Sequence, residues 1–339
     1  MRHCIFPTLA ALVMLLAACE KQIDIDVDAR QPEVVVRALG ETGEPLAVRL
    51  TYSRPVFGTF YVPNGEGYFK EIADATVSLS VDGSPHSGVN VDGGNYTFAY
   101  QPQAGDHLVL SVAVPGHKTV TAEAVVPHKP AVSGIGVSRN TDQDRGIRNN
   151  TIAFTLADPA SSTDYYSVRL RCHETSIYTK YDADSNIVWT DTTRNEYYCD
   201  FKCTDYTVIS STGIDVIDPE DPDAANTYVG DEMLFSDANI NGNQHQFKLE
   251  PYGYYEYEDY DNYYGYDTIE RYMNSRDYYL EVSAISRDTY MYLQSVDAYD
   301  YDEVLSLFSE PVQIHSNVSG GIGIFGIRTK VSFKLQLND

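Results

Sequence analysis

Tryptophan, cysteine and basic residues are scarce in this sequence of 339 residues. It has one tryptophan and five cysteines, and its 24 lysines and arginines are outnumbered by 49 aspartates and glutamates, for a net charge of −25. A chain this acidic repels nucleic-acid phosphates and anionic lipid headgroups. We therefore expect neither nucleic acid nor an anionic lipid surface among its partners.

Hydrophobic runs long enough to span a bilayer are also missing. The apolar stretch Ile5–Leu16 is too short to cross as a helix, and it follows a basic start, which predicts that residues 1–18 are a cleaved signal peptide. The ending Leu16-Ala17-Ala18-Cys19 is typical of a bacterial lipoprotein, so we predict lipidation of Cys19 and a polar tether over residues 19–31. The alternative is an ordinary signal peptide with Cys19 as an incidental thiol.

Three cysteines remain once the signal peptide and the lipidated residue are set aside. In an oxidising compartment we expect one disulfide, joining Cys172 to either Cys199 or Cys203. Cys199 and Cys203 would lie about 13 Å apart on one strand, too far to bond each other. A zinc site that adds His173 is the alternative, but it lacks the paired spacing of zinc ligands, so we expect no metal.

The composition favours a mainly β protein. Twenty-eight tyrosines and many valines, threonines, glycines and aspartates are typical of short strands and turns. The chain is longer than one sandwich, so we expect two domains, a β-sandwich over residues 32–127 and a larger β-rich domain over residues 131–339. Two prolines in Pro127–Pro130 predict the linker between them.

Alternating strands separated by turn signals fill the first domain and indicate an immunoglobulin-like or transthyretin-like sandwich. Its predicted strands are Glu33–Ala38, Leu46–Ser53, Thr76–Val81, Asn95–Tyr100, His107–Val114 and His117–Val126. In the second domain we predict Thr151–Leu156, Tyr165–Cys172, Ile187–Thr192, Glu196–Cys203, Tyr206–Ile209, Gln246–Glu250, Tyr278–Ala284, Val312–Ser316, Gly321–Ile327 and Lys330–Leu337.

One short helix is expected in the second domain, at Arg287–Val296. Ser286 is placed as its N-cap, and Tyr290, Leu293 and Val296 recur on one face. We interpret this apolar stripe as core rather than as a partner surface.

A loop that alternates tyrosine with acidic residues is the candidate contact site. Phenol rings suit stacking on sugars or gripping peptides, and carboxylates attract cationic groups. The equally weighted alternative is a hairpin whose rings pack on the domain, and binding of a hard metal ion is a third reading. The tyrosines are Tyr254, Tyr255, Tyr257, Tyr260, Tyr263, Tyr264 and Tyr266.

Motifs of nucleotide binding and catalysis are missing or lack their context. The string Gly321–Gly326 matches GxGxxG, but β-type residues follow it where a helix is required, so we predict a glycine-rich strand. No HExxH or GxSxG occurs. We expect neither an enzyme nor a cofactor, although the carboxylates of a hydrolase converge only in space.

Three features together resemble a family of Bacteroidota outer-membrane lipoproteins that carry a domain of unknown function. They are the ending at Cys19, the valine-rich start Pro32–Leu39 with Ala75–Leu79, and the run Phe308–Gly326. The acidic residues after Cys19 also resemble a surface-export signal of such lipoproteins. Members are typically encoded beside TonB-dependent receptors, so the resemblance implies an outer-membrane location facing outward and an accessory role in nutrient uptake.

From these points we predict a lipid-anchored accessory binding or docking partner of a TonB-dependent transporter. The competing reading is a structural or adhesive surface lipoprotein without a transported ligand, and a surface hydrolase ranks third.

Overall fold

The computed structural model describes residues 32–54, 69–142, 147–182, 184–205, 227–251, 261–263, 269–305 and 313–336. Its strands and its helix belong to one compact unit, Glu33–Ser53 with Val62–Asp339. The fold is mainly β, with sandwich-type packing of sheets, which confirms the predicted fold class. In the described ranges, no helix has the length and the apolar character needed to cross a membrane.

Six of the first eight strands alternate buried side chains with less buried ones, as a sheet with one face on a core requires. In β3, for example, Val77, Leu79 and Val81 are buried while Thr76 and Ser78 are exposed. The bounds are β1 Val34–Glu41, β2 Ala47–Tyr52, β3 Thr76–Val81, β4 Ser84–Ser87, β5 Val89–Asp92, β6 Asn95–Thr97, β7 His107–Ala113 and β8 Val120–Val125. All six predicted strands of this part are present, and β4 and β5 are additional.

Most of the strands predicted in the later part are longer in the structure, but the predicted strand Val312–Ser316 is wrong over residues 313–316, which have no regular structure. The later elements are β9 Ala131–Asp142, β10 Ile147–Ala157, β11 Tyr165–Tyr181, β12 Ile187–Cys199, β13 Phe201–Cys203, β14 Tyr228–Gly230, β15 Glu232–Ser236, the 3-10 turn η3 Asp237–Asn239, β16 Gln244–Pro251, β17 Asp261–Tyr263, β18 Ile269–Ile285, α3 Arg287–Leu305, β19 Val318–Ser319 and β20 Ile322–Leu335. The predicted strand Tyr206–Ile209 lies outside the described residues. The predicted linker Pro127–Pro130 has no regular structure, and β9 begins at Ala131.

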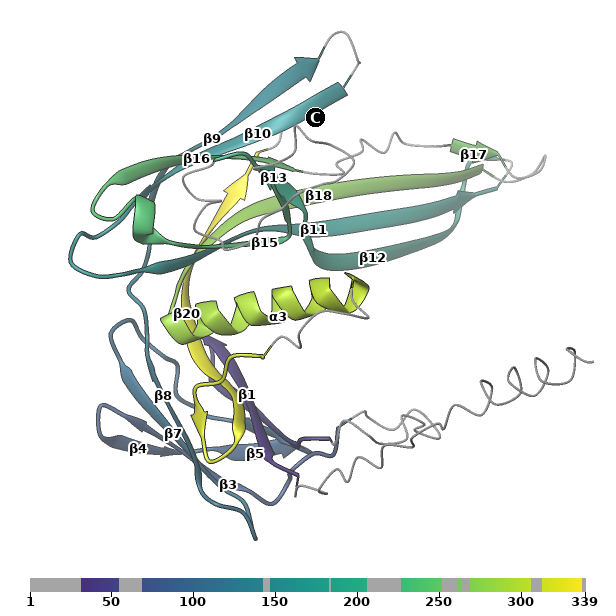
Figure 1. Cartoon of the computed structure of the whole chain (residues 1–339). Helices are drawn as coiled ribbons and strands as arrows, with labels where there is room; N and C mark the ends of the chain where they lie inside the picture. The colour runs from purple at the N-terminus through teal and green to yellow at the C-terminus, as the bar shows by residue number, and fades with distance from the viewer. Residues whose placement is uncertain are drawn as a thin grey trace, which may run out of the picture. The chain divides into compact units, whose positions relative to one another are not determined.

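One large sheet connects the two halves of the sequence. Its order is β12-β11-β18-β20-β1-β2-β6-β5, with β15 also on β11 and β17 on β18 (Figure 1). The last strand, β20, pairs in parallel with β1 over Val35–Glu41 and antiparallel with β18 over Tyr278–Ile285. Two five-stranded sheets complete the fold, β19-β8-β7-β3-β4 and β14-β13-β16-β10-β9. The expected division into two domains remains a prediction. β20 pairs with strands of both halves of the sequence.

Two hydrophobic cores lie against the same face of the large sheet. Phe325 and Ile327 of β20 belong to the core shared with β3, β7 and β8, whereas Val331 and Leu335 of the same strand belong to the core shared with β10, β13 and β16. These four positions have the same parity, so they project from one face of β20. A single strand therefore contributes to both sandwiches.

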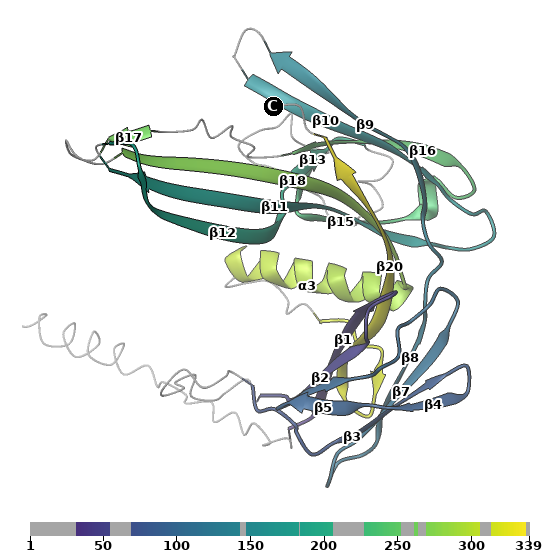
Figure 2. The same ribbon diagram turned by 180° about the vertical axis from the view of Figure 1, so that it is seen from behind.

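Helix α3 packs on the opposite face of the large sheet. Tyr290 is buried with Ile285 and Leu234, and Leu293 is half-buried against them. Ser286 accepts a hydrogen bond from the Thr289 N–H at 3.2 Å, which confirms the predicted N-cap. The helix lies beside β20 in both ribbon views (Figures 1 and 2) and continues to Leu305, beyond the predicted end at Val296.

Candidate functional site

Most of the residues predicted to form a site lie outside the described part of the chain. The lipidation candidate Cys19 is one of them, and Tyr263 lies in β17, whose backbone pairs with β18. The other tyrosines of the predicted contact loop also lie outside the described residues: Tyr254, Tyr255, Tyr257, Tyr260, Tyr264 and Tyr266. Their roles remain predictions.

The three later cysteines are free thiols, so the expected disulfide is not formed in this structure. Cys172 lies opposite Tyr197 in the β11–β12 ladder, and Cys199 lies two positions further on the same face, opposite Leu170. The Cys199 and Tyr197 side chains hydrogen-bond the Cys172 sulfur, and these bonds lower the pKa of Cys172. The diagonal placement explains a hydrogen-bonded pair of thiols in place of a bond.

Cys203 lies on β13, in another sheet, although its side chain reaches the same hydrophobic core as Cys172. Burial raises the pKa of the Cys203 thiol to about 11. The structure therefore brings together one of the two cysteine pairs that the sequence left open, Cys172 with Cys199. The covalent bond itself remains a prediction.

The predicted glycine-rich strand is confirmed, because residues 322–326 of the glycine string belong to β20. Gly323 has a φ of +124°, and a Cβ at this position would overlap the carbonyl oxygen of Val36 on β1. A Cβ at Gly326 would overlap the side chain of Thr289 on α3. The glycines thus permit close approach of β1 and α3 to β20.

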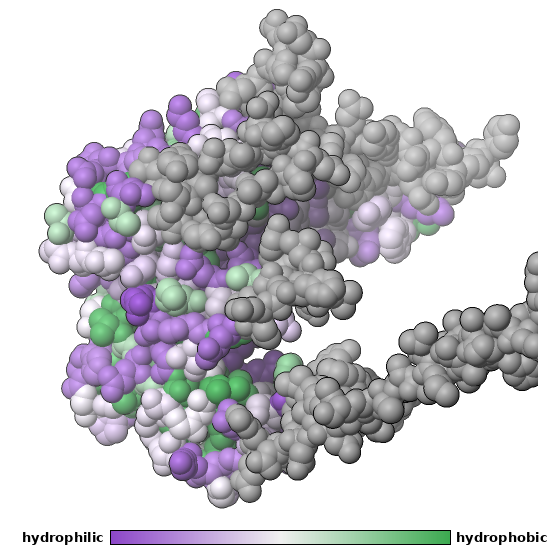
Figure 3. Space-filling model, viewed as in Figure 1, coloured by the Kyte–Doolittle hydropathy of each residue, from purple (hydrophilic) through white to green (hydrophobic). Residues whose placement is uncertain are grey.

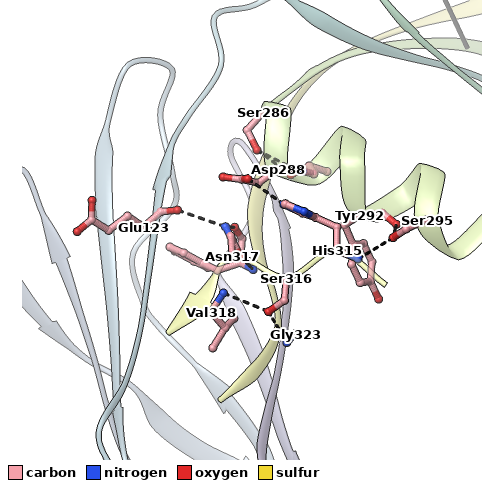
Figure 4. A network of polar contacts seen from close by, with 12 residues as sticks. Glu123, Ser286, Asp288, Tyr292, Ser295, His315, Ser316, Asn317, Val318 and Gly323 are labelled. Atoms are coloured by element: carbon pink, nitrogen blue, oxygen red, sulfur yellow. Dashed lines mark hydrogen bonds and ion pairs between the residues drawn. The ribbon is translucent and has the colours of Figure 1, made fainter. Parts of the chain in front are cut away.

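The segment just before β19 is held in place by a polar network (Figure 4). Ser316 Oγ accepts the Gly323 N–H at 3.0 Å, and Asn317 both accepts the Phe325 N–H at 2.9 Å and donates to the Phe325 carbonyl at 2.8 Å. β18 pairs with β20 only from Arg328 onward. Two side chains therefore bond backbone groups of β20 where β18 has not yet joined it.

His315 links the same segment to α3. Its Nε2 lies 2.9 Å from Asp288 Oδ1, and its backbone N–H donates to Ser295 Oγ at 2.9 Å. A histidine, an acid and serines stand close together here, which prompts a comparison with a nucleophilic triad. Within the described residues, however, no serine hydroxyl bonds the His315 ring, and the hydroxyls of Ser295 and Ser316 bond the backbone. These contacts join the segment before β19 to α3 and to β20, which is a structural role.

A buried glutamate organises the α3 side of the large sheet. The Glu281 side chain on β18 is fully buried, and its oxygens lie 2.7 Å from Arg171 Nε, 3.2 Å from Arg169 Nη2 and 3.3 Å from Lys330 Nζ. Lys330 also reaches Glu41 at 3.0 Å. One buried anion surrounded by three cations is compensated, so the group holds β11, β18 and β20 in register.

Among the described residues, one group of three acidic side chains could bind a cation. Asp158 and Asp164 lie in the loop between β10 and β11, and Asp237 begins η3. One oxygen each of Asp158, Asp164 and Asp237 lies within 4.8 Å of the others. Asp158 accepts bonds from the Tyr166 hydroxyl at 2.7 Å and the Gly242 N–H at 3.0 Å. Burial, together with the charges of Asp158 and Asp164, raises the pKa of Asp237.

Oxygen ligands of this kind suit a hard cation such as Ca²⁺. Asp237 is distant in sequence from Asp158 and Asp164, and the three follow no motif spacing, so no sequence pattern predicts this group. The expectation of no bound metal remains a prediction.

A second feature that the sequence did not reveal is an exposed β arm, formed by the outer parts of β11, β12 and β18 (Figure 1). Twelve of the 13 residues of β12 are exposed. At the hairpin end, Ile187, Val188 and Trp189 are 64%, 60% and 53% exposed, and Tyr178 on β11 is 47% exposed. We call these four residues the arm tip. Consecutive exposed apolar residues that include the only tryptophan of the chain are typical of a contact surface.

Hydrophilic residues are widespread over the described part of the face shown in Figure 3, as the net charge of −25 leads one to expect. A comparison with curated proteins finds no match. A family model described as "Domain of unknown function (DUF4249)" matches residues 20–334. Because that match covers nearly the whole sequence, the chain belongs to this family, whose function is not established.

Proposed function

We propose that the protein is a lipid-anchored cell-envelope protein that acts as an accessory binding or docking partner of a TonB-dependent outer-membrane transporter in nutrient uptake. Lipidation of Cys19 would tether it, and the outer membrane facing outward is the location we assign to it. The protein acts by contact and not by catalysis.

The observation that carries the docking role is the arm tip. Tryptophan and tyrosine dominate the binding energy of protein interfaces, and an isolated tip of this kind has no core of its own to fill. The tip is displayed at the end of paired strands, which hold its side chains in fixed directions. A rigid aromatic surface is suited to contact with another protein.

Charge restricts the kind of surface that meets this protein. The chain carries −25, and Asp191 lies opposite Tyr178 of the tip. A complementary surface on the transporter is therefore expected to carry lysine or arginine around an apolar centre. Such a contact weakens as salt increases, because exposed charges are screened.

Co-purification from native outer membranes tests this proposal. The lipidated protein is extracted in detergent, and TonB-dependent receptors bound to it are quantified by mass spectrometry per molecule of lipoprotein. We expect one such receptor in a fixed ratio, and a fall of about tenfold when Trp189 is replaced by serine, the size of a single interface hot spot.

A matched control is Tyr299→Ser on α3, where the tyrosine is 47% exposed. This variant should keep the receptor at the wild-type ratio. If no TonB-dependent receptor accompanies the wild-type protein, the docking role is wrong and the structural or adhesive reading replaces it. Equal receptor with all three proteins would show instead that docking uses another surface.

A further inference from the structure

Strand β12 is a long free edge of the large sheet. It pairs with β11 alone among the described strands, from Ile187 to Cys199, and its side chains are exposed over almost the whole length. Such an edge presents a row of unpaired N–H and C=O groups that can accept another strand.

Several of the usual protections of an edge strand are missing from β12, although it carries three charged residues. It contains no proline and no lysine, and its register with β11 is unbroken from Trp189 to Cys199, the shift lying at the hairpin end. Valine, isoleucine, threonine and aromatic residues, all good strand formers, make up most of it. It is therefore built for pairing on its second side.

Other edges of the described sheets are protected. β5 has four residues and a register shift, and β4 has four residues including Pro85. β9 is long, but Gly134 has a φ of +61° and the register with β10 shifts near Thr155. Among the longer edges, β12 is the regular one.

We propose that β12 pairs with β12 of a second copy of this chain, antiparallel and centred on Thr193, so that the large sheets of two molecules become continuous. This contact is separate from docking to a transporter, because side chains of a paired strand still project from both faces of the sheet. Tyr178 on β11 thus stays exposed in both copies, whereas Trp189 also contacts the partner.

Symmetry limits the possible centres. A two-fold axis that joins antiparallel strands in one sheet is perpendicular to the sheet and keeps each side chain on its own face, so one residue must face its own copy. A centre at Asp191 or at Arg194 would set like charges opposite each other, which destabilises the pair. A centre at Thr193 sets threonine against threonine.

The centre at Thr193 also matches the flanking residues and uses the full strand. Trp189 then faces the partner's Tyr197, an aromatic pair of the kind that stabilises sheets. The pairs between these and the centre are Asp191 with the partner's Asn195, Thr192 with the partner's Arg194, and Thr190 with the partner's Glu196. No like charges are opposed in this register.

Local charge favours this edge for a second copy. The chain has a net charge of −25, yet β12 carries only Asp191, Glu196 and Arg194. Repulsion between two copies is therefore small along the strand in comparison with the charge of the whole molecule.

A cross-link at the symmetry axis tests the register. Thr193→Cys places two thiols opposite each other in the lipidated protein, and copper phenanthroline transfers their two electrons to dioxygen with loss of two protons, forming an intermolecular disulfide. Thr190→Cys is the control, because its two copies would lie about 20 Å apart along the strands. We expect several-fold more linked dimer with Thr193→Cys than with Thr190→Cys or with wild type.

Equal cross-linking at the two positions, or more at Thr192→Cys or Asn195→Cys, would overturn the register. Light scattering of the wild-type protein in detergent tests the pairing itself. We expect a dimer that becomes monomeric on Thr192→Lys and remains a dimer on Val91→Lys at the other edge of the sheet. A wild-type protein that stays monomeric at every concentration would overturn the proposal.

Discussion

Replacing Asn317 by alanine should destabilise the fold strongly for a half-exposed polar residue. The side chain donates to the Phe325 carbonyl at 2.8 Å, accepts the Phe325 N–H at 2.9 Å and donates to the Glu123 carbonyl at 3.4 Å. Phe325 is fully buried, so alanine would leave its two backbone groups without these partners.

The expected magnitude follows from counting the bonds. Leaving a buried donor or acceptor unsatisfied costs about 1–3 kcal/mol each, and the long bond to Glu123 adds little. We expect Asn317→Ala to lower the free energy of unfolding by about 2–4 kcal/mol. Ser319→Ala, on an exposed residue nearby, should change it by less than about 0.5 kcal/mol.

Urea unfolding of the soluble chain, without signal peptide and lipid, measures this difference. The slope of free energy against urea should be the same for both variants and wild type, because the surface exposed on unfolding does not change. Asn317→Asp separates the two strong bonds, since it keeps the acceptor and loses the donor. If Asn317→Ala were as stable as Ser319→Ala, the Asn317 side chain would not be needed to satisfy the Phe325 backbone groups, and this account of the segment before β19 would be wrong.

Three further perturbations have expected outcomes. Because its pKa is raised, Asp237 gives stability that is full below the ordinary aspartate pKa and lost as pH rises through the raised value. In a chelator, Asp237→Asn should therefore stabilise the fold at pH 7 and give no gain at pH 3 by thermal melting. Oxidised glutathione should link Cys172 to Cys199 and leave Cys203 as a thiol. Peptide mapping that found any other cysteine pair would contradict this expectation. Glu281→Gln should lower the free energy of unfolding, measured in urea, by about 3–5 kcal/mol, because three cations lose their buried partner. Glu196→Gln, at a side chain that is 57% exposed, should lower it by less than about 1 kcal/mol.

Strands with one face on a core could be predicted closely from the sequence. Thr76–Val81 was predicted with both bounds as observed, because its apolar residues alternate and turns bound it. β4 and β5 were missed, since short exposed strands such as Ser84–Ser87 carry no hydrophobic period. Local alternation therefore reports burial, and strands without burial escape it.

The long elements were predicted in pieces for a related reason. β12 was expected as two strands, but its exposed residues give no pattern across Arg194 and Asn195. β20 was expected to break between Ile327 and Lys330, yet Arg328 and Lys330 project to the face where Glu232 and Glu281 pair with them. Polar residues within a strand look like a turn until their partners, about 50 or more residues away, are known.

Candidate sites depend on such distant contacts even more than the strands do. The acidic group unites Asp158 and Asp164 with Asp237, and the fastening of the last strands unites Asp288 with His315. Neither has a spacing that a sequence motif describes. The tyrosine loop was singled out by its composition alone, whereas the arm tip was not, because three consecutive apolar residues in a predicted strand are common.

The run Phe308–Gly326, on which the family resemblance partly rests, has a physical role that bears on where function lies. Its glycines let β1 and α3 approach β20, and Ser316 and Asn317 bond backbone groups of β20 before β18 joins it. These contacts join β20 to β1, to α3 and to the segment before β19, and the fold would need them whatever the protein binds. The features that resemble the family therefore support the shared fold. The partner is better sought on the arm, whose residues take no part in these contacts.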